Sequence, residues 1–152
     1  MLSGFKLLRP ARYLSYIHLM TNEVAPGITR TRTYLTTQEM RARQLKADVF
    51  STPAMIGLME LTCVELTEPY LDPNEQTVGI HVDVRHMAPT KIGQTVTVKA
   101  ELLEVKDNKL RYAVAATNDE GVKIGEGLHR RAVINTKRFG GEAETNPKGG
   151  SL

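Results

Sequence analysis

Glu60 is the most unusual polar residue in the sequence, because it lies within an otherwise apolar stretch. If this stretch is helical, the neighbours three and four residues away are Ile56, Gly57, Cys63 and Val64. Burial raises the pKa of a carboxyl group, and a buried charge without a partner is costly. We therefore expect a buried carboxylate that is either hydrogen-bonded in a structural role or active as an acid or base. Its neighbours do not decide between the two.

Thr52 and His86 offer a hydroxyl and an imidazole for the same chemistry. Thr52 directly precedes Pro53, which predicts that Thr52 is the N-cap of a helix. The free N–H groups at such a helix start can also stabilise an oxyanion. His86 ends a predicted strand on its buried face, where a lone histidine is more often structural than catalytic. Together with Glu60, the two residues indicate acid–base chemistry, with the structural alternative left open.

A helix that begins at Thr52 must position Glu60. Its apolar residues surround nearly the whole circumference instead of forming one stripe: Met55, Ile56, Leu58, Met59, Leu61, Cys63, Val64 and Leu66. This pattern predicts a helix buried within the fold.

Strands account for most of the remaining pattern. A stretch rich in β-branched and aromatic residues predicts a strand at 28–35, and alternation predicts further strands at 77–86, 94–105, 110–117 and 122–135. The alternation slips at Leu103, and a short polar helix is predicted at 38–46. One strand, a long helix and four successive strands predict an α+β fold, with an antiparallel sheet wrapped around a central helix.

Composition limits the classes of protein. The 152 residues suit one domain, and the net charge of +3 comes without a recognisable nucleic-acid-binding pattern, so no nucleic-acid partner is expected. No apolar run approaches the length of a membrane span, so no membrane partner is expected either. Cys63, the single cysteine, is predicted to be an inert core thiol. Because the histidines lack metal-ligand spacing, we expect no metal and no cofactor.

The two ends differ from the predicted domain at 26–139. Residues 1–25 form an N-terminal extension whose first 22 residues contain basic but no acidic side chains, as in mitochondrial transit peptides. This segment is compatible with two alternatives. It either directs the protein to mitochondria, or it is an extension without a targeting role on a cytoplasmic protein. Residues 140–152 are rich in glycine and polar residues and are predicted to be a flexible tail.

Three segments carry a resemblance to a known family. They are residues 49–60, which include Thr-Pro-Ala-Met-Ile-Gly-Leu-Met-Glu, residues 79–86, and residues 125–134. In order and spacing they resemble the fluoroacetyl-CoA thioesterase-like family of hot-dog proteins, over roughly residues 26–139. The resemblance implies a single hot-dog domain with catalytic residues at Thr52, Glu60 and His86. It also implies that Gly79 helps to form the acyl pocket and that Arg131 assists substrate binding.

The same resemblance implies an acyl-CoA thioesterase that hydrolyses a short or medium acyl-CoA to a carboxylic acid and coenzyme A, as a homodimer with sites near the subunit interface. Two departures weigh on this expectation. Arg43 and Lys46 occupy the segment where the fluoroacetate-specific enzyme has an aromatic lid, and Arg130 replaces a common glutamate. They leave open a non-catalytic acyl-CoA-binding protein. A hot-dog hydratase or dehydratase fits the matched residues less well.

Overall fold

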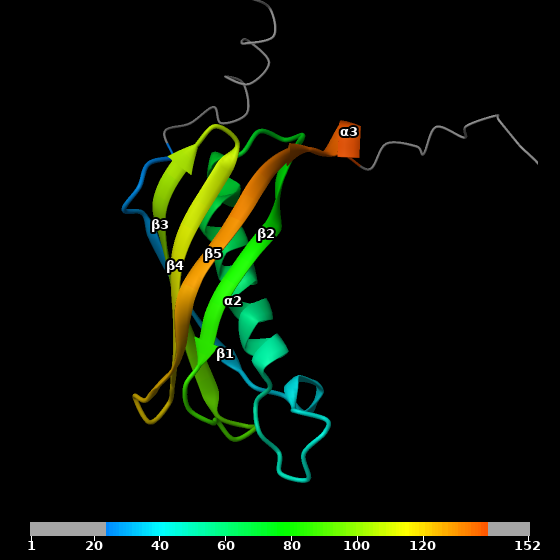
Figure 1. Cartoon of the computed structure of the whole chain (residues 1–152), viewed down its shortest axis with the longest axis vertical. Helices are drawn as coiled ribbons and strands as arrows, with labels where there is room; N and C mark the ends of the chain where they lie inside the picture. The colour runs from blue at the N-terminus through cyan, green and yellow to red at the C-terminus, as the bar shows by residue number, and fades with distance from the viewer. Residues whose placement is uncertain (1–23, 140–152) are drawn as a thin grey trace, which may run out of the picture.

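A five-stranded antiparallel sheet curves around one long helix (Figure 1). The computed structural model describes residues 24–139, so the predicted tail and nearly all of the predicted extension lie outside the described residues. The strands are β1 Thr29–Leu35, β2 Glu75–His86, β3 Thr95–Lys106, β4 Lys109–Asn118 and β5 Lys123–Asn135, in the spatial order β1-β3-β4-β5-β2. The helix is α2 Thr52–Thr67. This arrangement confirms the predicted α+β fold.

Short helical turns complete the described chain. They are the 3-10 turns η1 Gln38–Met40 and η2 Glu68–Tyr70 and the four-residue helix α3 Thr136–Phe139. The helix predicted at 38–46 was therefore wrong beyond its first turn. The backbone N–H of Ala42 donates to Val49 O, and Arg41 pairs with Phe50 in an isolated bridge, so the chain folds back on itself. Burial of Ala42 and Phe50 favours this loop over a solvated helix.

Helix α2 begins where the sequence predicts, but Ser51 is its N-cap. The Ser51 hydroxyl accepts a hydrogen bond of 3.3 Å from the N–H of Ala54, and Pro53 lies in the first turn. The prediction that Thr52 caps the helix was therefore wrong, because serine fulfils the same role one residue earlier. The Thr52 hydroxyl is left available for another partner.

One face of α2 packs on the concave side of the sheet. Its buried apolar residues are Met55, Leu58, Met59, Cys63 and Leu66, and they meet alternating residues of β3 and β4 such as Val98, Leu102, Tyr112 and Val114. Burial raises the pKa of Cys63 to about 12, as expected of an inert core thiol. No segment within residues 24–139 covers the opposite face, and Leu61 is 44% exposed. The prediction that the helix is buried around its whole circumference was therefore wrong for a single chain.

Strand β2 forms one edge of the sheet and is irregular at its centre. Its pairing with β5 shifts register between Gly79 and His81, which marks a β-bulge. On either side of the bulge Thr77 and Val82 lie opposite Val133 and His129 of β5. Ile80 and Val82 are 48% and 42% exposed, although their alternation predicted a buried face. The slip predicted near Leu103 is confirmed, because the β3–β4 register shifts between Leu102 and Glu104.

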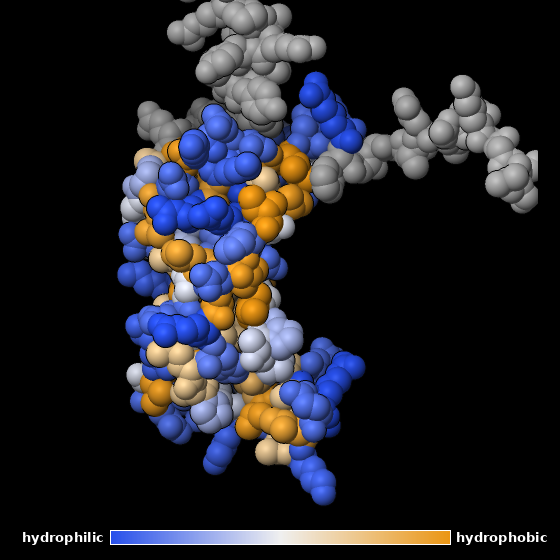
Figure 2. All heavy atoms as spheres, in the orientation of Figure 1, coloured by the Kyte–Doolittle hydropathy of each residue, from blue (hydrophilic) through white to orange (hydrophobic). Residues whose placement is uncertain are grey.

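Hydrophobic side chains gather over α2 and β2 on the hollowed side of the molecule (Figure 2). On these two elements Leu61, Ile80 and Val82 are each more than a third exposed. Within residues 24–139 no helix has both the length and the apolar character needed to cross a membrane.

Candidate active site

Thr52 and His86 meet at one end of α2. Thr52 Oγ1 lies 2.8 Å from His86 Nδ1, so a residue at the helix start and a residue at the end of β2 form a direct hydrogen bond. Phe50 packs edge-on against the imidazole, with ring centroids 6.5 Å apart. When Nδ1 carries no proton, the Thr52 hydroxyl donates to it. This is the geometry of a hydroxyl next to a general base.

Burial favours the neutral form of the His86 imidazole. Desolvation lowers the pKa of His86 below its ordinary value of 6.5, and the nearby backbone of Ala88 opposes this shift only in part. Its Nε2 is buried and has no hydrogen-bond partner among the described residues. A neutral imidazole with one ring nitrogen on a hydroxyl is able to accept a proton at neutral pH.

A cavity of 910 Å³ opens beside this pair. It is lined by Thr52 and His86, by the loop that follows η1, and by the turn after β2. Arg43 lies in this lining and is exposed, whereas Arg41 pairs with Asp48 at 3.1 Å. The volume lies within the range of small-molecule sites, which is roughly 300–1,000 Å³. The cavity therefore places the Thr52–His86 pair beside space for a ligand.

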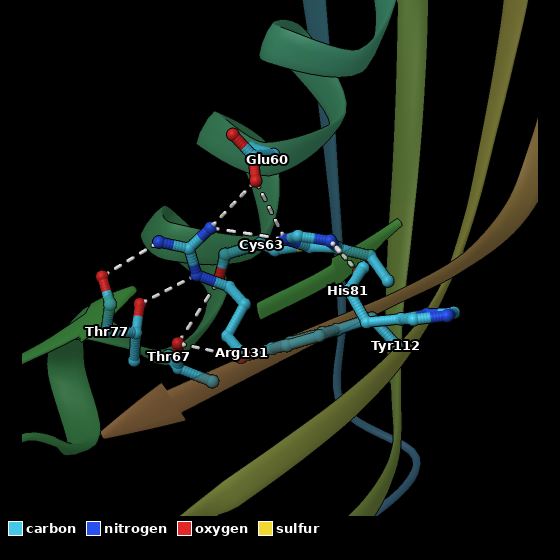
Figure 3. A network of polar contacts seen from close by, with 8 residues as sticks. Glu60, Cys63, Thr67, Thr77, His81, Tyr112 and Arg131 are labelled. Atoms are coloured by element: carbon cyan, nitrogen blue, oxygen red, sulfur yellow. Dashed lines mark hydrogen bonds and ion pairs between the residues drawn. The ribbon is translucent and has the colours of Figure 1, made fainter. Parts of the chain in front are cut away.

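Glu60 belongs to a second polar cluster, farther along the helix (Figure 3). Its Oε1 lies 3.4 Å from His129 Nε2 and 3.7 Å from Arg131 Nη1. The Glu60 side chain is 39% exposed, so the expectation of a buried carboxylate was wrong for a single chain. The sheet covers the other side of α2, and nothing among the described residues covers this one.

Arg131 is the most firmly held member of this cluster. Its Nε donates to Thr77 Oγ1 at 2.9 Å and its Nη2 to Thr77 O at 2.8 Å. Its Nη1 lies 3.2 Å from His129 Nε2. Only 7% of the side chain is exposed, and its charge lies beside Glu60. The residue predicted to assist substrate binding therefore lies against a predicted catalytic residue.

Gly79 makes room for Glu60. A Cβ on Gly79 would clash with Glu60 Oε1 and would lie 3.3 Å from His129 Cε1. The glycine adjoins the β2 bulge, where the backbone comes close to the helix. The structure thus brings Gly79, Glu60 and Arg131 together.

The predicted residues accordingly fall into two groups within one chain. Thr52 and Glu60 are eight residues apart on α2, which at 1.5 Å per residue separates their Cα atoms by about 12 Å along the helix axis. A single small group cannot contact both side chains at hydrogen-bond distance.

Two members of the second cluster, His129 and Thr77, were not predicted. The available signal was the alternation of β5, which places His129, Arg131 and Val133 on one face. The reach from β5 to Thr77 of β2 depends on the register between the strands and is not visible in sequence. Among residues 24–139 no group of three or more histidine, cysteine, aspartate or glutamate residues is arranged to hold a metal ion.

Comparison with known proteins places the chain in a family. Residues 29–137 match the family model described as fluoroacetyl-CoA-specific thioesterase, FlK. The chain belongs to this family. The match covers the whole sheet, α2 and both polar clusters, and the family resemblance predicted from sequence is confirmed.

Individual relatives agree with this assignment. The fluoroacetyl-CoA thioesterase of Streptantibioticus cattleyicolor is 46% identical over 92 residues, which are 60% of this chain and 66% of that protein, just under two-thirds of its length. A solved structure of fluoroacetyl-CoA thioesterase FlK is 33% identical, with a TM-score of 0.76, and the match covers 84% of this chain and 100% of that one. A point mutant of FlK, solved in complex with fluoroacetate and CoA, is 37% identical with a TM-score of 0.72, over 76% of this chain and 99% of that one. The hot-dog fold predicted for the domain is therefore confirmed.

Proposed function

We propose that this protein is an acyl-CoA thioesterase, which hydrolyses a short or medium acyl-CoA to a carboxylic acid and free coenzyme A. The observation that carries the proposal is the 2.8 Å contact between Thr52 Oγ1 and His86 Nδ1 beside a cavity of 910 Å³. Membership of the fluoroacetyl-CoA-specific thioesterase family supports the same reaction.

In the proposed reaction an oxygen nucleophile attacks the thioester carbonyl carbon and the C–S bond breaks. The nucleophile is either water held by Thr52 or the Thr52 hydroxyl itself, in which case water then hydrolyses an acyl-enzyme. His86 accepts the proton of the attacking oxygen and returns it to the sulfur of coenzyme A. The free N–H groups at the start of α2 are donors for the developing oxyanion.

Glu60 enters this reaction through a second copy of the chain. We infer a homodimer formed along the β2 edge and the uncovered face of α2, where Leu61, Ile80 and Val82 are exposed. An unpaired strand edge next to apolar side chains favours burial against another molecule. In such a dimer Glu60 of the partner subunit faces the Thr52–His86 pair, which brings the two groups of predicted catalytic residues together.

A mixing experiment tests the shared site. Glu60→Gln and His86→Ala chains are refolded together in equal amounts, and each is also measured alone. If each site takes Glu60 from one chain and His86 from the other, mixed dimers regain one intact site, and activity returns to about a quarter of wild type by random pairing. Mixtures that stay as inactive as the single variants, although native mass spectrometry shows mixed dimers, would contradict the shared site.

A substrate panel tests the reaction itself. Short and medium acyl-CoA thioesters are offered to the wild type, and released thiol is measured. If no thioester is hydrolysed above its uncatalysed rate while acyl-CoA still binds, the alternative function as a non-catalytic acyl-CoA-binding protein is correct. Selectivity for fluoroacetyl-CoA is not proposed, because the exposed Arg43 lines the cavity in the segment where the fluoroacetate-specific enzyme has an aromatic lid.

The N-terminal extension carries a separate proposal. We propose mitochondrial localisation, because residues 1–22 combine basic and apolar side chains without an acidic one. Fusing these residues to a fluorescent protein tests it, and a diffuse cytosolic signal would reject it.

A further inference from the structure

His129 is buried in the second polar cluster and has no role in the reaction proposed above. It is 1% exposed, and its ring stacks against Tyr112 with centroids 6.3 Å apart. Its Nδ1 lies 2.9 Å from the carbonyl oxygen of His81. A carbonyl oxygen only accepts hydrogen bonds, so Nδ1 carries a proton and donates it.

The other ring nitrogen of His129 faces the two charged groups of the cluster. Nε2 lies 3.2 Å from Arg131 Nη1 and 3.4 Å from Glu60 Oε1. Arg131 has only donors, so its hydrogen bond to Nε2 requires a free lone pair on that nitrogen. The hydrogen bonds on its two sides therefore assign one tautomer, with the proton on Nδ1.

The charges around the ring agree with a neutral imidazole. Burial lowers the pKa of His129, and the Arg131 charge and His81 lower it further. The carbonyl of His81 and the Glu60 carboxylate act in the opposite direction, but the net shift is downward. Tyr112, on the remaining side, stays neutral because burial raises its pKa.

A neutral His129 leaves the positive charge of Arg131 uncancelled. Within the described part of the chain the hydrogen bonds of Arg131 all end on neutral acceptors, namely Thr77 Oγ1, Thr77 O and His129 Nε2. These acceptors fix the guanidinium without cancelling its charge. Among the described residues the carboxylate that it pairs with is Glu60, whose Oε1 lies 3.7 Å from Arg131 Nη1. The positive charge is thus held at a defined place beside a carboxylate that stays free to contact something else.

We propose that His129 is a positioning residue of the thioesterase site, which fixes Arg131 and thereby the position of Glu60. The β2 bulge supports this arrangement, because the register shift beside Gly79 brings the His81 carbonyl to His129 Nδ1. The proposal rests on the proposed function in so far as Glu60 takes part in hydrolysis.

Two substitutions separate the two hydrogen bonds of His129. The amide nitrogen of His129→Asn reaches the place of Nδ1 and keeps the bond to His81, but it leaves Arg131 without an acceptor. The amide oxygen of His129→Gln reaches the place of Nε2 and keeps the acceptor. We expect His129→Asn to lower kcat about 10- to 100-fold with KM nearly unchanged, and His129→Gln to retain most of kcat.

Tyr112→Phe is the matched control for burial. It removes the hydroxyl that lies 3.1 Å from Thr67 Oγ1 and leaves the contacts of Arg131 intact. We expect a lower melting temperature with unchanged kcat. If both His129 variants lose kcat equally, in proportion to their loss of melting temperature, His129 is only a core residue and the proposal is overturned.

A spectroscopic measurement keeps this proposal distinct from the proposed function. Nitrogen-15 NMR of the wild type at pH 7 should show His129 protonated on Nδ1 and not on Nε2. A protonated Nε2 overturns the positioning role, whatever the enzyme activity. An inactive wild type with the expected tautomer would instead reject the thioesterase function while leaving the arrangement of His129 and Arg131 intact.

Discussion

The two polar clusters of this protein are built in different ways. Thr52 and His86 form a single contact at the rim of a cavity, and Thr52 is exposed. Arg131 and His129, by contrast, are almost completely buried and are tied to β2 by three hydrogen bonds. The first cluster has open space beside it, and the second has a fixed framework.

The two clusters suit two different requirements of the proposed reaction. In the proposed reaction Thr52 and His86 exchange protons with a substrate, and their position in the cavity lining gives them access to it. A group that supplies a fixed charge must not move, and burial among neutral acceptors ensures this for Arg131. Glu60 lies between these extremes, held on one side and exposed on the other.

Removing the base at the rim should have the largest effect. We expect His86→Ala to lower kcat/KM about 10²- to 10⁴-fold, because general acid–base catalysis contributes this much. Stability should change little, since the imidazole makes one side-chain hydrogen bond. His81→Ala is the matched control, because this exposed side chain lies on the same strand and only its carbonyl binds His129. Equal loss in both variants would remove His86 from the mechanism.

Thr52→Val tests what the hydroxyl does. If Thr52 orients water, we expect Thr52→Val to lower kcat about 10- to 100-fold. If Thr52 is the nucleophile, the loss in kcat should exceed about 10³-fold, and the wild type should form an acyl-enzyme that can be trapped. Ser51→Ala is the control, because Ser51 caps the helix. It should lower the free energy of unfolding by about 1 kcal/mol with the chemistry intact. The reverse pattern would show that the two residues had been assigned wrongly.

Gly79→Ala should disturb the fixed cluster without removing any of its polar groups. The added methyl group would clash with Glu60 Oε1, so the carboxylate must move away from Arg131. We expect a loss in kcat of about tenfold or more, because small displacements of a catalytic group are costly. Steady-state kinetics checks this. An unchanged kcat in Gly79→Ala would show that the position of Glu60 does not matter.

The pH dependence should be the smallest effect near neutrality. Because desolvation lowers the pKa of His86, the base stays neutral until the pH falls below its ordinary value of 6.5, so kcat/KM should be level above this pH and decline only below it. Stability should follow the same direction. His86 and His129 both have lowered pKa values when folded, so the unfolded chain binds more protons and stability falls as the pH drops below 6.5. Melting temperatures that rise on acidification from pH 7.5 to about 5.5 would contradict this.

Local sequence patterns predicted the framework well. The Thr52-Pro53 pair located the start of α2, although Ser51 and not Thr52 is the cap, and the break in alternation at Leu103 located the irregularity in β3. Such features depend on residues close in sequence, whose backbone preferences and side-chain periods are set locally. The helix predicted at 38–46 was wrong because its structure depends on contacts that the local pattern does not contain. Polar residues favoured a solvated helix, but burial of Phe50 drew the chain back into a loop.

By itself, the sequence determined which residue types are able to carry chemistry and, through the family resemblance, predicted that Thr52, Glu60 and His86 act together. Only the tertiary structure decided that Thr52 and His86 are in contact while Glu60 joins Arg131 and His129. The physical reason is that helix geometry separates Thr52 from Glu60, and the bulge and register of β2 against β5 select the partners of each. Strand register is a relation between distant segments, so no local pattern contains it.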